Sequence, residues 1–87
     1  MNAILVYDIN EERVQKVMKI CRKYLHHVQN SVFEGEISEA KLEQLKLELN
    51  KVINTEKDSI IIYTFRTNWY SKREIIGVEK GKEELIL

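Results

Sequence analysis

One carboxylate, Asp8, follows an apolar run at the start of the chain. Residues 3–7 (AILVY) are typical of a buried strand, and the sequence after Asp8 becomes helical. An aspartate in this position can be a turn residue, a helix cap or half of a metal site. Asn10 is the better candidate for the cap because Glu11 and Glu12 would then occupy the first helical turn, where carboxylates complement the helix dipole. Asp8 is therefore not needed as a cap.

The alternation of the first strand places Asp8 on the same side as Ile4 and Val6. Leu5 and Tyr7 lie on the other side, so both faces of this strand are apolar. If the Asp8 face meets a second copy near a two-fold axis, two carboxylates approach each other and repel unless one is protonated or a divalent cation lies between them. Mg²⁺ or Mn²⁺ suits such oxygen ligands and can polarise a phosphodiester or activate water. A strand-end turn residue is the simpler interpretation, and it stays open.

Other side chains with chemical potential have weaker support. His26 and His27 can exchange protons or touch phosphates, but no strong partner occurs at a diagnostic spacing, and a surface or strand-edge position explains them as well. Ser31 has no nearby acid to complete a nucleophilic triad, which favours hairpin chemistry or a phosphate contact. Trp69 is a candidate for an exposed contact with a base. Cys21 is the single cysteine and cannot form an internal disulfide or a zinc cluster.

A segment without acidic residues runs from residue 13 to residue 33. The chain as a whole is neutral, with 14 basic and 14 acidic side chains. The segment carries only basic charges: Arg13, Lys16, Lys19, Arg22 and Lys23, followed by the two histidines. A neutral protein with such a segment can present a basic surface to a polyanion. A solvated helix face is the alternative interpretation.

Hydrophobic periodicity predicts an α+β fold. The expected elements are a strand over residues 3–9, a helix capped by Asn10, two short strands forming a hairpin over residues 27–33, a helix capped by Ser38, a strand over residues 59–65 after the polar turn with Asp58, and a strand over residues 73–78. The continuous apolar run of residues 59–65 predicts a strand buried on both faces and central in its sheet. This order is the ferredoxin-like β-α-β-β-α-β plan with an additional C-terminal strand, in which two helices cover one face of an antiparallel sheet.

The length of 87 residues predicts one domain over residues 1–78 and a charged tail over residues 79–87 that can dock on a partner. The sheet face without helices needs a cover, and we expect a homodimer, with a curled C-terminal segment as the alternative. The sequence contains no apolar run long enough to span a membrane and no secretion signal at its start. These features predict a cytoplasmic protein without a membrane partner.

Three segments taken together resemble a known family. VYD at the end of the first strand, VQNSVFEG in the hairpin and DSIIIY in the late strand are similar to the small ferredoxin-like CRISPR-associated protein Cas2 of spacer acquisition. The resemblance covers nearly the whole chain in the right order. It implies a symmetric homodimer in which the strand-end aspartate of each protomer, here Asp8 after Tyr7, faces its mate and holds Mg²⁺ or Mn²⁺.

The resemblance implies either of two functions. Members are described as metal-dependent endonucleases that cleave single-stranded RNA or duplex DNA, with Asp8 as the catalytic residue here. The family also bridges CRISPR integrase dimers and holds the DNA to be inserted, a scaffold role in which this aspartate is dispensable. Tyr7, Ser31 and Phe33 would shape the dimer cleft, and the residues expected to bind nucleic acid are Arg13, Lys16, Lys19, Lys23 and His27. Outside the family, a regulatory domain that binds a small ligand is a third hypothesis, and it predicts no affinity for nucleic acid.

Overall fold

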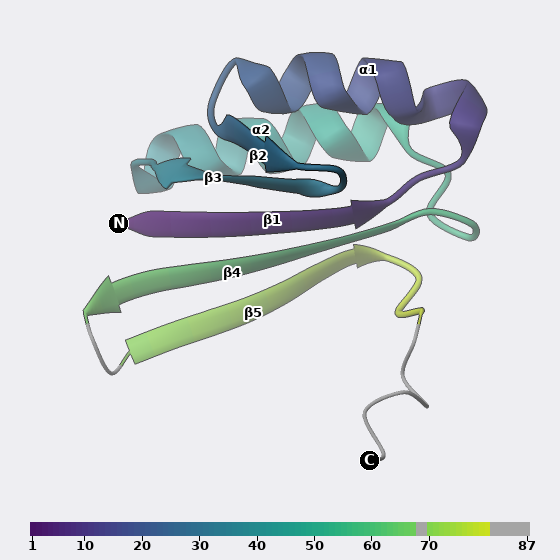
Figure 1. The fold of residues 1–87 in the computed structure, drawn as a ribbon. Helices are drawn as coiled ribbons and strands as arrows, with labels where there is room; N and C mark the ends of the chain where they lie inside the picture. The colour runs from purple at the N-terminus through teal and green to yellow at the C-terminus, as the bar shows by residue number, and fades with distance from the viewer. Residues whose placement is uncertain (68–69, 81–87) are drawn as a thin grey trace.

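The computed structural model describes residues 1–67 and 70–80. Its elements in chain order are β1 (Asn2–Asp8), α1 (Glu11–Arg22), β2 (His26–Gln29), β3 (Val32–Glu36), α2 (Glu39–Val52), β4 (Ser59–Thr67) and β5 (Tyr70–Gly77) (Figure 1). The predicted order of helices and strands is confirmed, with shifts of a few residues at the strand ends. Trp69 and residues 81–87 lie outside the described residues, so the predictions for Trp69 and for most of the tail stay predictions.

The five strands form one antiparallel sheet in the order β2-β3-β1-β4-β5. Val6 of β1 pairs with Val32 of β3 on one side and with Ile61 of β4 on the other. β1 is therefore the middle strand, and the prediction that residues 59–65 form the central strand is wrong. In the ferredoxin-like plan β1 and β3 are the inner strands, and β5 extends the sheet beyond β4. β4 is an inner strand with a neighbour on each side, and its side chains that face the helices, Ile60 and Ile62, are buried.

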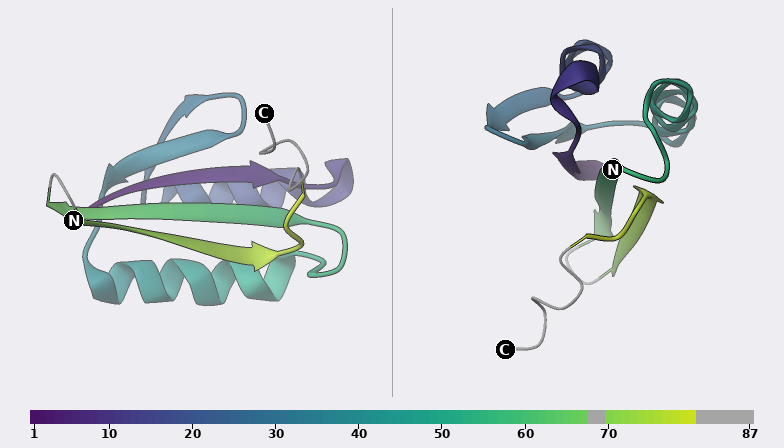
Figure 2. Two further views of the ribbon diagram at one scale, coloured as in Figure 1. Left: turned by 90° about the horizontal axis from the view of Figure 1, so that it is seen from below. Right: turned by 90° about the vertical axis from the view of Figure 1, so that its right-hand side faces the viewer.

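Both helices begin at the predicted caps and lie on one face of the sheet. The Asn10 side chain accepts a hydrogen bond from the Glu12 amide at 3.2 Å, and the Ser38 hydroxyl accepts one from the Lys41 amide at 3.2 Å. Seen along the sheet, the two helices lie side by side above it (Figure 2, right). Neither helix of the described residues has the length and hydropathy needed to cross a membrane. The core between helices and sheet consists mainly of Ala3, Leu5, Tyr7, Val17, Cys21, Leu25, Phe33, Leu42, Leu45, Leu49, Ile60 and Ile62.

The opposite sheet face has no helix over it. In the view from below, the strands lie in front of both helices (Figure 2, left). Ile4 and Val6 of β1 and Ile61 and Tyr63 of β4 point to this side and are only half-buried, and Phe65 is 36% exposed. The prediction that residues 59–65 are buried on both faces therefore does not hold within one chain. We call the surface made by these five side chains the open face.

Asp58 fastens the end of the sheet at which β1 finishes. Its buried carboxylate accepts hydrogen bonds from the backbone amides of Asn10 (3.0 Å) and Asn54 (2.9 Å). Arg13 donates two more, from Nε at 2.6 Å and from Nη2 at 3.0 Å. These bonds, the Arg13 bond foremost, hold the pKa of Asp58 well below its usual range. The carboxylate thus ties the start of α1 to the turn before β4, a role beyond the turn chemistry that the sequence predicted.

Replacing this carboxylate tests its structural role. Asp58→Asn leaves buried donors without a charged acceptor, so we expect a loss of about 3 kcal/mol in the free energy of unfolding, measured by urea denaturation at pH 7. Because the pKa of Asp58 is lower in the folded than in the unfolded chain, its contribution is fully present above about pH 4 and falls as the pH falls further. The variant should lose this acid dependence. Glu56→Gln in the same turn is the control, since Glu56 is exposed; equal acid profiles for wild type and Asp58→Asn would contradict the assignment.

Candidate active site at the end of β1

Asp8 lies on the side of the sheet that the sequence alternation predicted. It is the last residue of β1, pairs in register with Ser59 of β4, and shares the face of Ile4 and Val6. Its side chain is 70% exposed, and the Lys80 ammonium lies 3.5 Å from Asp8 Oδ2. Among the described residues, no three His, Cys, Asp or Glu side chains gather into a metal-binding group. A carboxylate is a donor that suits a hard cation, and one chain supplies one such carboxylate at this position.

Tyr7, the residue before Asp8, holds the turn of the β2–β3 hairpin through two hydrogen bonds. The Tyr7 hydroxyl donates a hydrogen bond to the Asn30 carbonyl at 2.9 Å, and the Tyr7 amide donates to the Ser31 carbonyl at 3.0 Å. Tyr7 is buried, and burial raises the pKa of its hydroxyl, which therefore stays protonated as a donor. These bonds join Asn30 and Ser31 to Tyr7, so the hairpin turn is held at the end of β1.

His27 and Phe33 complete this unit on the helix side of the sheet. His27 Nε2 lies 2.9 Å from the Asn30 carbonyl, and because a carbonyl only accepts, Nε2 carries the proton. The His27 ring stacks on Phe33 with centroids 4.8 Å apart, and Tyr7 lies 6.1 Å from Phe33. Tyr7 and Phe33 are buried, so they position the hairpin from the core. Their predicted part in a dimer cleft, and that of Ser31, stay predictions.

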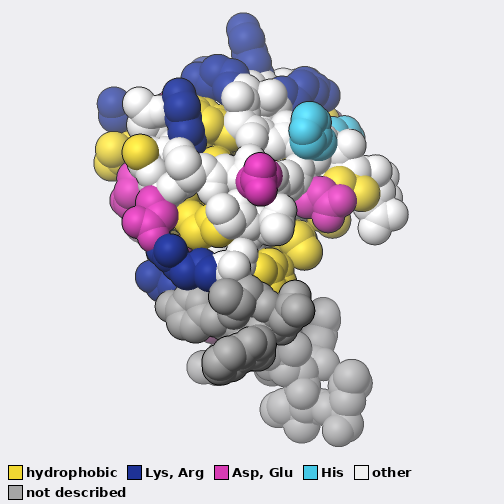
Figure 3. All heavy atoms as spheres, turned by 90° about the vertical axis from the view of Figure 1, so that its left-hand side faces the viewer, with side chains coloured by type: hydrophobic (Ala, Val, Ile, Leu, Met, Phe, Trp, Pro, Cys, Tyr) yellow, Lys and Arg dark blue, Asp and Glu magenta, His cyan; other side chains and the backbone are white. Residues whose placement is uncertain are grey.

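Three of the predicted basic residues form a common surface on α1. Lys16, Lys19 and Lys23 are exposed and border a shallow cavity of about 260 Å³ that Ile20 and Val52 also line. The Lys23 ammonium also pairs with Glu48 of α2. Seen from the end at which β1 begins, Lys and Arg side chains gather over α1 at the top, with the histidines beside them (Figure 3). We call Lys16, Lys19 and Lys23 the lysine surface. It faces away from the sheet, whereas Asp8 lies at the rim of the open face, so one chain does not bring the two together.

Arg13 does not join the lysine surface. Its side chain is 18% exposed, bonds Asp58 as described, and also pairs with Glu12 at 2.9 Å. The structure thus gives Arg13 a structural partner, and its predicted contact with nucleic acid stays a prediction. Sequence reasoning missed this pair because Arg13 and Asp58 are 45 residues apart in the chain.

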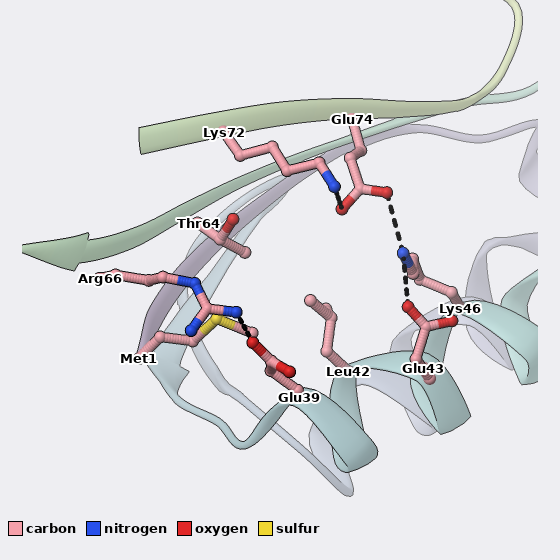
Figure 4. A pocket seen from close by; sticks show the side chains of 9 residues that line it. All are labelled: Met1, Glu39, Leu42, Glu43, Lys46, Thr64, Arg66, Lys72 and Glu74. Carbon is pink, nitrogen blue, oxygen red and sulfur yellow. Dashed lines mark hydrogen bonds and ion pairs between the residues drawn. The ribbon is translucent and has the colours of Figure 1, made fainter. Parts of the chain in front are cut away.

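A cavity lies at the other end of the sheet from Asp8 (Figure 4). It measures about 260 Å³, and α2, the end of β4 and the start of β5 enclose it. Its charges pair with one another: Glu39 with Arg66, and Lys46 with Glu43 at 3.0 Å and Glu74 at 2.8 Å. Since these charged groups already have partners, the cavity gives little support to the small-ligand hypothesis.

A family model described as CRISPR associated protein Cas2 matches residues 1–73. The chain belongs to the Cas2 family. A curated relative from Dictyoglomus turgidum, named CRISPR-associated endoribonuclease Cas2, is 55% identical over 87 residues, which is 100% of both chains. A relative of the same name from Thermotoga maritima is 49% identical over 86 residues, 99% of each chain.

Solved Cas2 structures share the fold. One crystal structure of Cas2 aligns with a TM-score of 0.74 and 42% identity, covering 92% of this chain and 90% of the other. Streptococcus pyogenes Cas2 at pH 6.5 aligns with a TM-score of 0.70 and 36% identity, covering 79% of this chain and 90% of the other. The predicted ferredoxin-like arrangement and the resemblance to Cas2 are both confirmed.

Proposed function

We propose that this Cas2 protein is a homodimeric, metal-dependent endonuclease of CRISPR adaptation, and that the two copies of Asp8 form its centre. The observation that carries the proposal is the position of Asp8, an exposed carboxylate at the rim of an uncovered apolar sheet face. Relatives that match the chain over its full length are named endoribonucleases. These names favour RNA over duplex DNA, and we propose single-stranded RNA as the substrate.

The open face supports a two-fold dimer. Ile4, Val6, Ile61, Tyr63 and Phe65 form a contiguous apolar surface that crosses β1 and β4. A second copy that packs on this surface buries it, and a two-fold axis near the end of β1 brings each Asp8 toward its mate. The proposed site is therefore incomplete in one chain and complete in two.

Asp8 from each copy would hold the divalent cation, Mg²⁺ or Mn²⁺. The bound cation supplies charge neutralisation at the scissile phosphate and a more acidic water. Two other residues of the chain, Tyr7 and Asp58, hold the backbone near Asp8. Tyr7 holds the hairpin turn next to Asp8, and the Asp58 carboxylate fixes the backbone at Asn10, two residues beyond Asp8. These contacts fix the backbone on either side of Asp8, and a shared site would depend on that fixed backbone.

Removal of the Asp8 carboxylate tests catalysis. We expect wild type to cleave single-stranded RNA with Mg²⁺ or Mn²⁺, and EDTA and Asp8→Ala each to abolish cleavage, because both remove the cation. Denaturing gels of end-labelled RNA and duplex DNA measure this, with Glu56→Gln as a variant that loses an exposed carboxylate elsewhere. Equal metal-dependent cleavage by wild type and Asp8→Ala would contradict the assignment.

The dimer is tested through the open face. We expect wild type to scatter light as a particle of twice the 10.4 kDa chain mass, and Ile61→Asp to scatter as a monomer because it buries a charge in the interface. Leu47→Asp is the matched control, since Leu47 is 62% exposed on α2, away from the open face. Circular dichroism checks that both variants fold. A wild-type mass of 10.4 kDa at micromolar concentration would contradict the dimer.

A non-catalytic scaffold is the second candidate, and one observation favours it. The lysine surface lies on α1, on the other side of the sheet from Asp8, so a duplex can bind there without reaching the carboxylate. In this role the dimer bridges CRISPR integrase subunits and holds the DNA to be inserted, in the cytoplasm. If the wild type shows no cleavage activity, and Asp8→Ala binds the integrase as the wild type does, the result supports this candidate over the nuclease.

The lysine surface has its own test. Combined replacement of Lys16, Lys19 and Lys23 by Gln should weaken duplex binding and make the slope of log K against log salt less negative by about two to three, since each phosphate contact contributes about 0.9. Fluorescence anisotropy at several salt concentrations measures both. The matched control replaces three other exposed lysines, Lys41, Lys51 and Lys57, by Gln. Equal slopes for the two triple variants would contradict a specific role for this surface.

A further inference from the structure

The segment after β5 returns across the end of the sheet to Asp8. At Gly77 the backbone has φ +92°, and a Cβ there would lie 2.1 Å from the Asp58 carbonyl oxygen, so only glycine fits. The next residue, Val78, donates its amide hydrogen bond to that same carbonyl at 2.9 Å. Asp58 is itself fixed by Arg13. These contacts set the direction in which the chain leaves β5.

The two residues that follow each reach a charged partner. Glu79 pairs with Arg73 of β5 at 3.0 Å. Lys80 Nζ lies 3.5 Å from Asp8 Oδ2 and donates a hydrogen bond to the Asp8 carbonyl oxygen at 3.4 Å. Lys80 therefore contacts both the side chain and the backbone of the residue proposed to hold the metal, 72 positions earlier in the sequence.

From this geometry we infer that Lys80 is the resident counter-cation of Asp8 and exchanges with the divalent cation. The inference rests on the proposed function of Asp8. A carboxylate oxygen binds Mg²⁺ at about 2.0–2.1 Å, and an ammonium group next to that oxygen repels the incoming cation. The Lys80 ammonium therefore competes with the metal for the Asp8 carboxylate. The side chains are exposed, 38% for Lys80 and 70% for Asp8, so the pair is weak enough to separate.

Once displaced, the ammonium group remains near the site on a flexible stem. A phosphate of bound nucleic acid is the anion that it can then engage, by a charge-assisted hydrogen bond. Lys80 is thus a positioning residue. It pairs with the Asp8 carboxylate in the free protein and binds a phosphate of the nucleic acid in the complex. Without nucleic acid, its removal should tighten metal binding, and in cleavage it should raise KM because a phosphate contact is lost.

Carbodiimide cross-linking with peptide mass spectrometry tests the contact without an activity assay. The reagent converts a carboxylate into an O-acylisourea. A neighbouring lysine amine then attacks the acyl carbon, so that an amide forms and the urea leaves. We expect an Asp8–Lys80 cross-link in the metal-free protein that saturating Mn²⁺ suppresses. The Lys46–Glu74 pair, 2.8 Å apart at the other end of the sheet, is the internal control and should cross-link equally with and without Mn²⁺. A mixture of isotope-labelled and unlabelled chains should show that the Asp8–Lys80 link is within one chain.

Metal titration of matched variants gives the second readout. Lys80→Gln should bind Mn²⁺ roughly two- to fivefold more tightly than wild type, the range that an exposed ion pair corresponds to. Lys80→Arg, which keeps the charge, and Lys41→Gln, which removes a charge elsewhere, should both bind as wild type does. An Asp8–Lys80 cross-link that is absent, that joins two copies, or that Mn²⁺ leaves unchanged would overturn the inference. Asp8-dependent cleavage in that case would leave the proposed function intact, whereas absence of cleavage would contradict the nuclease independently of the cross-link.

Discussion

The buried Asp58 carboxylate is the contact on which the candidate site depends. Three other chain segments contact this residue: the start of α1 through Asn10 and Arg13, the end of α2 through Asn54, and, at the backbone carbonyl, the chain that leaves β5. β1 ends two residues before Asn10. The position of Asp8, and the path that brings Lys80 to it, therefore both depend on one residue with no exposed surface of its own.

The second constraint is that only one face of β1 is buried. The helices cover one face of β1, so its other face, which ends in Asp8, has no helix over it. This division separates the two candidate surfaces: the lysine surface lies on the outside of α1, and Asp8 lies at the rim of the open face. A nuclease and a scaffold make different use of that separation. In a dimer joined at the open faces, the lysines of both chains remain outside, while the carboxylates approach each other inside.

Periodicity and capping rules predicted the elements well because these are local properties. The caps Asn10 and Ser38 follow from residue type and position, and the face of Asp8 follows from strand alternation. The sequence could not show which strand is central, because an apolar run indicates burial and not neighbours. Nor could it pair Arg13 with Asp58 or Lys80 with Asp8, since those contacts exist only after the fold joins distant segments.

The most direct measurement of the central claim is the stoichiometry of Mn²⁺ binding, followed by the electron paramagnetic resonance signal of the free ion. A site shared by two copies of Asp8 predicts one tightly bound ion for every two chains in wild type and none in Asp8→Asn. One tight ion per chain, or binding that is unchanged in Asp8→Asn, would contradict a shared site at the end of β1.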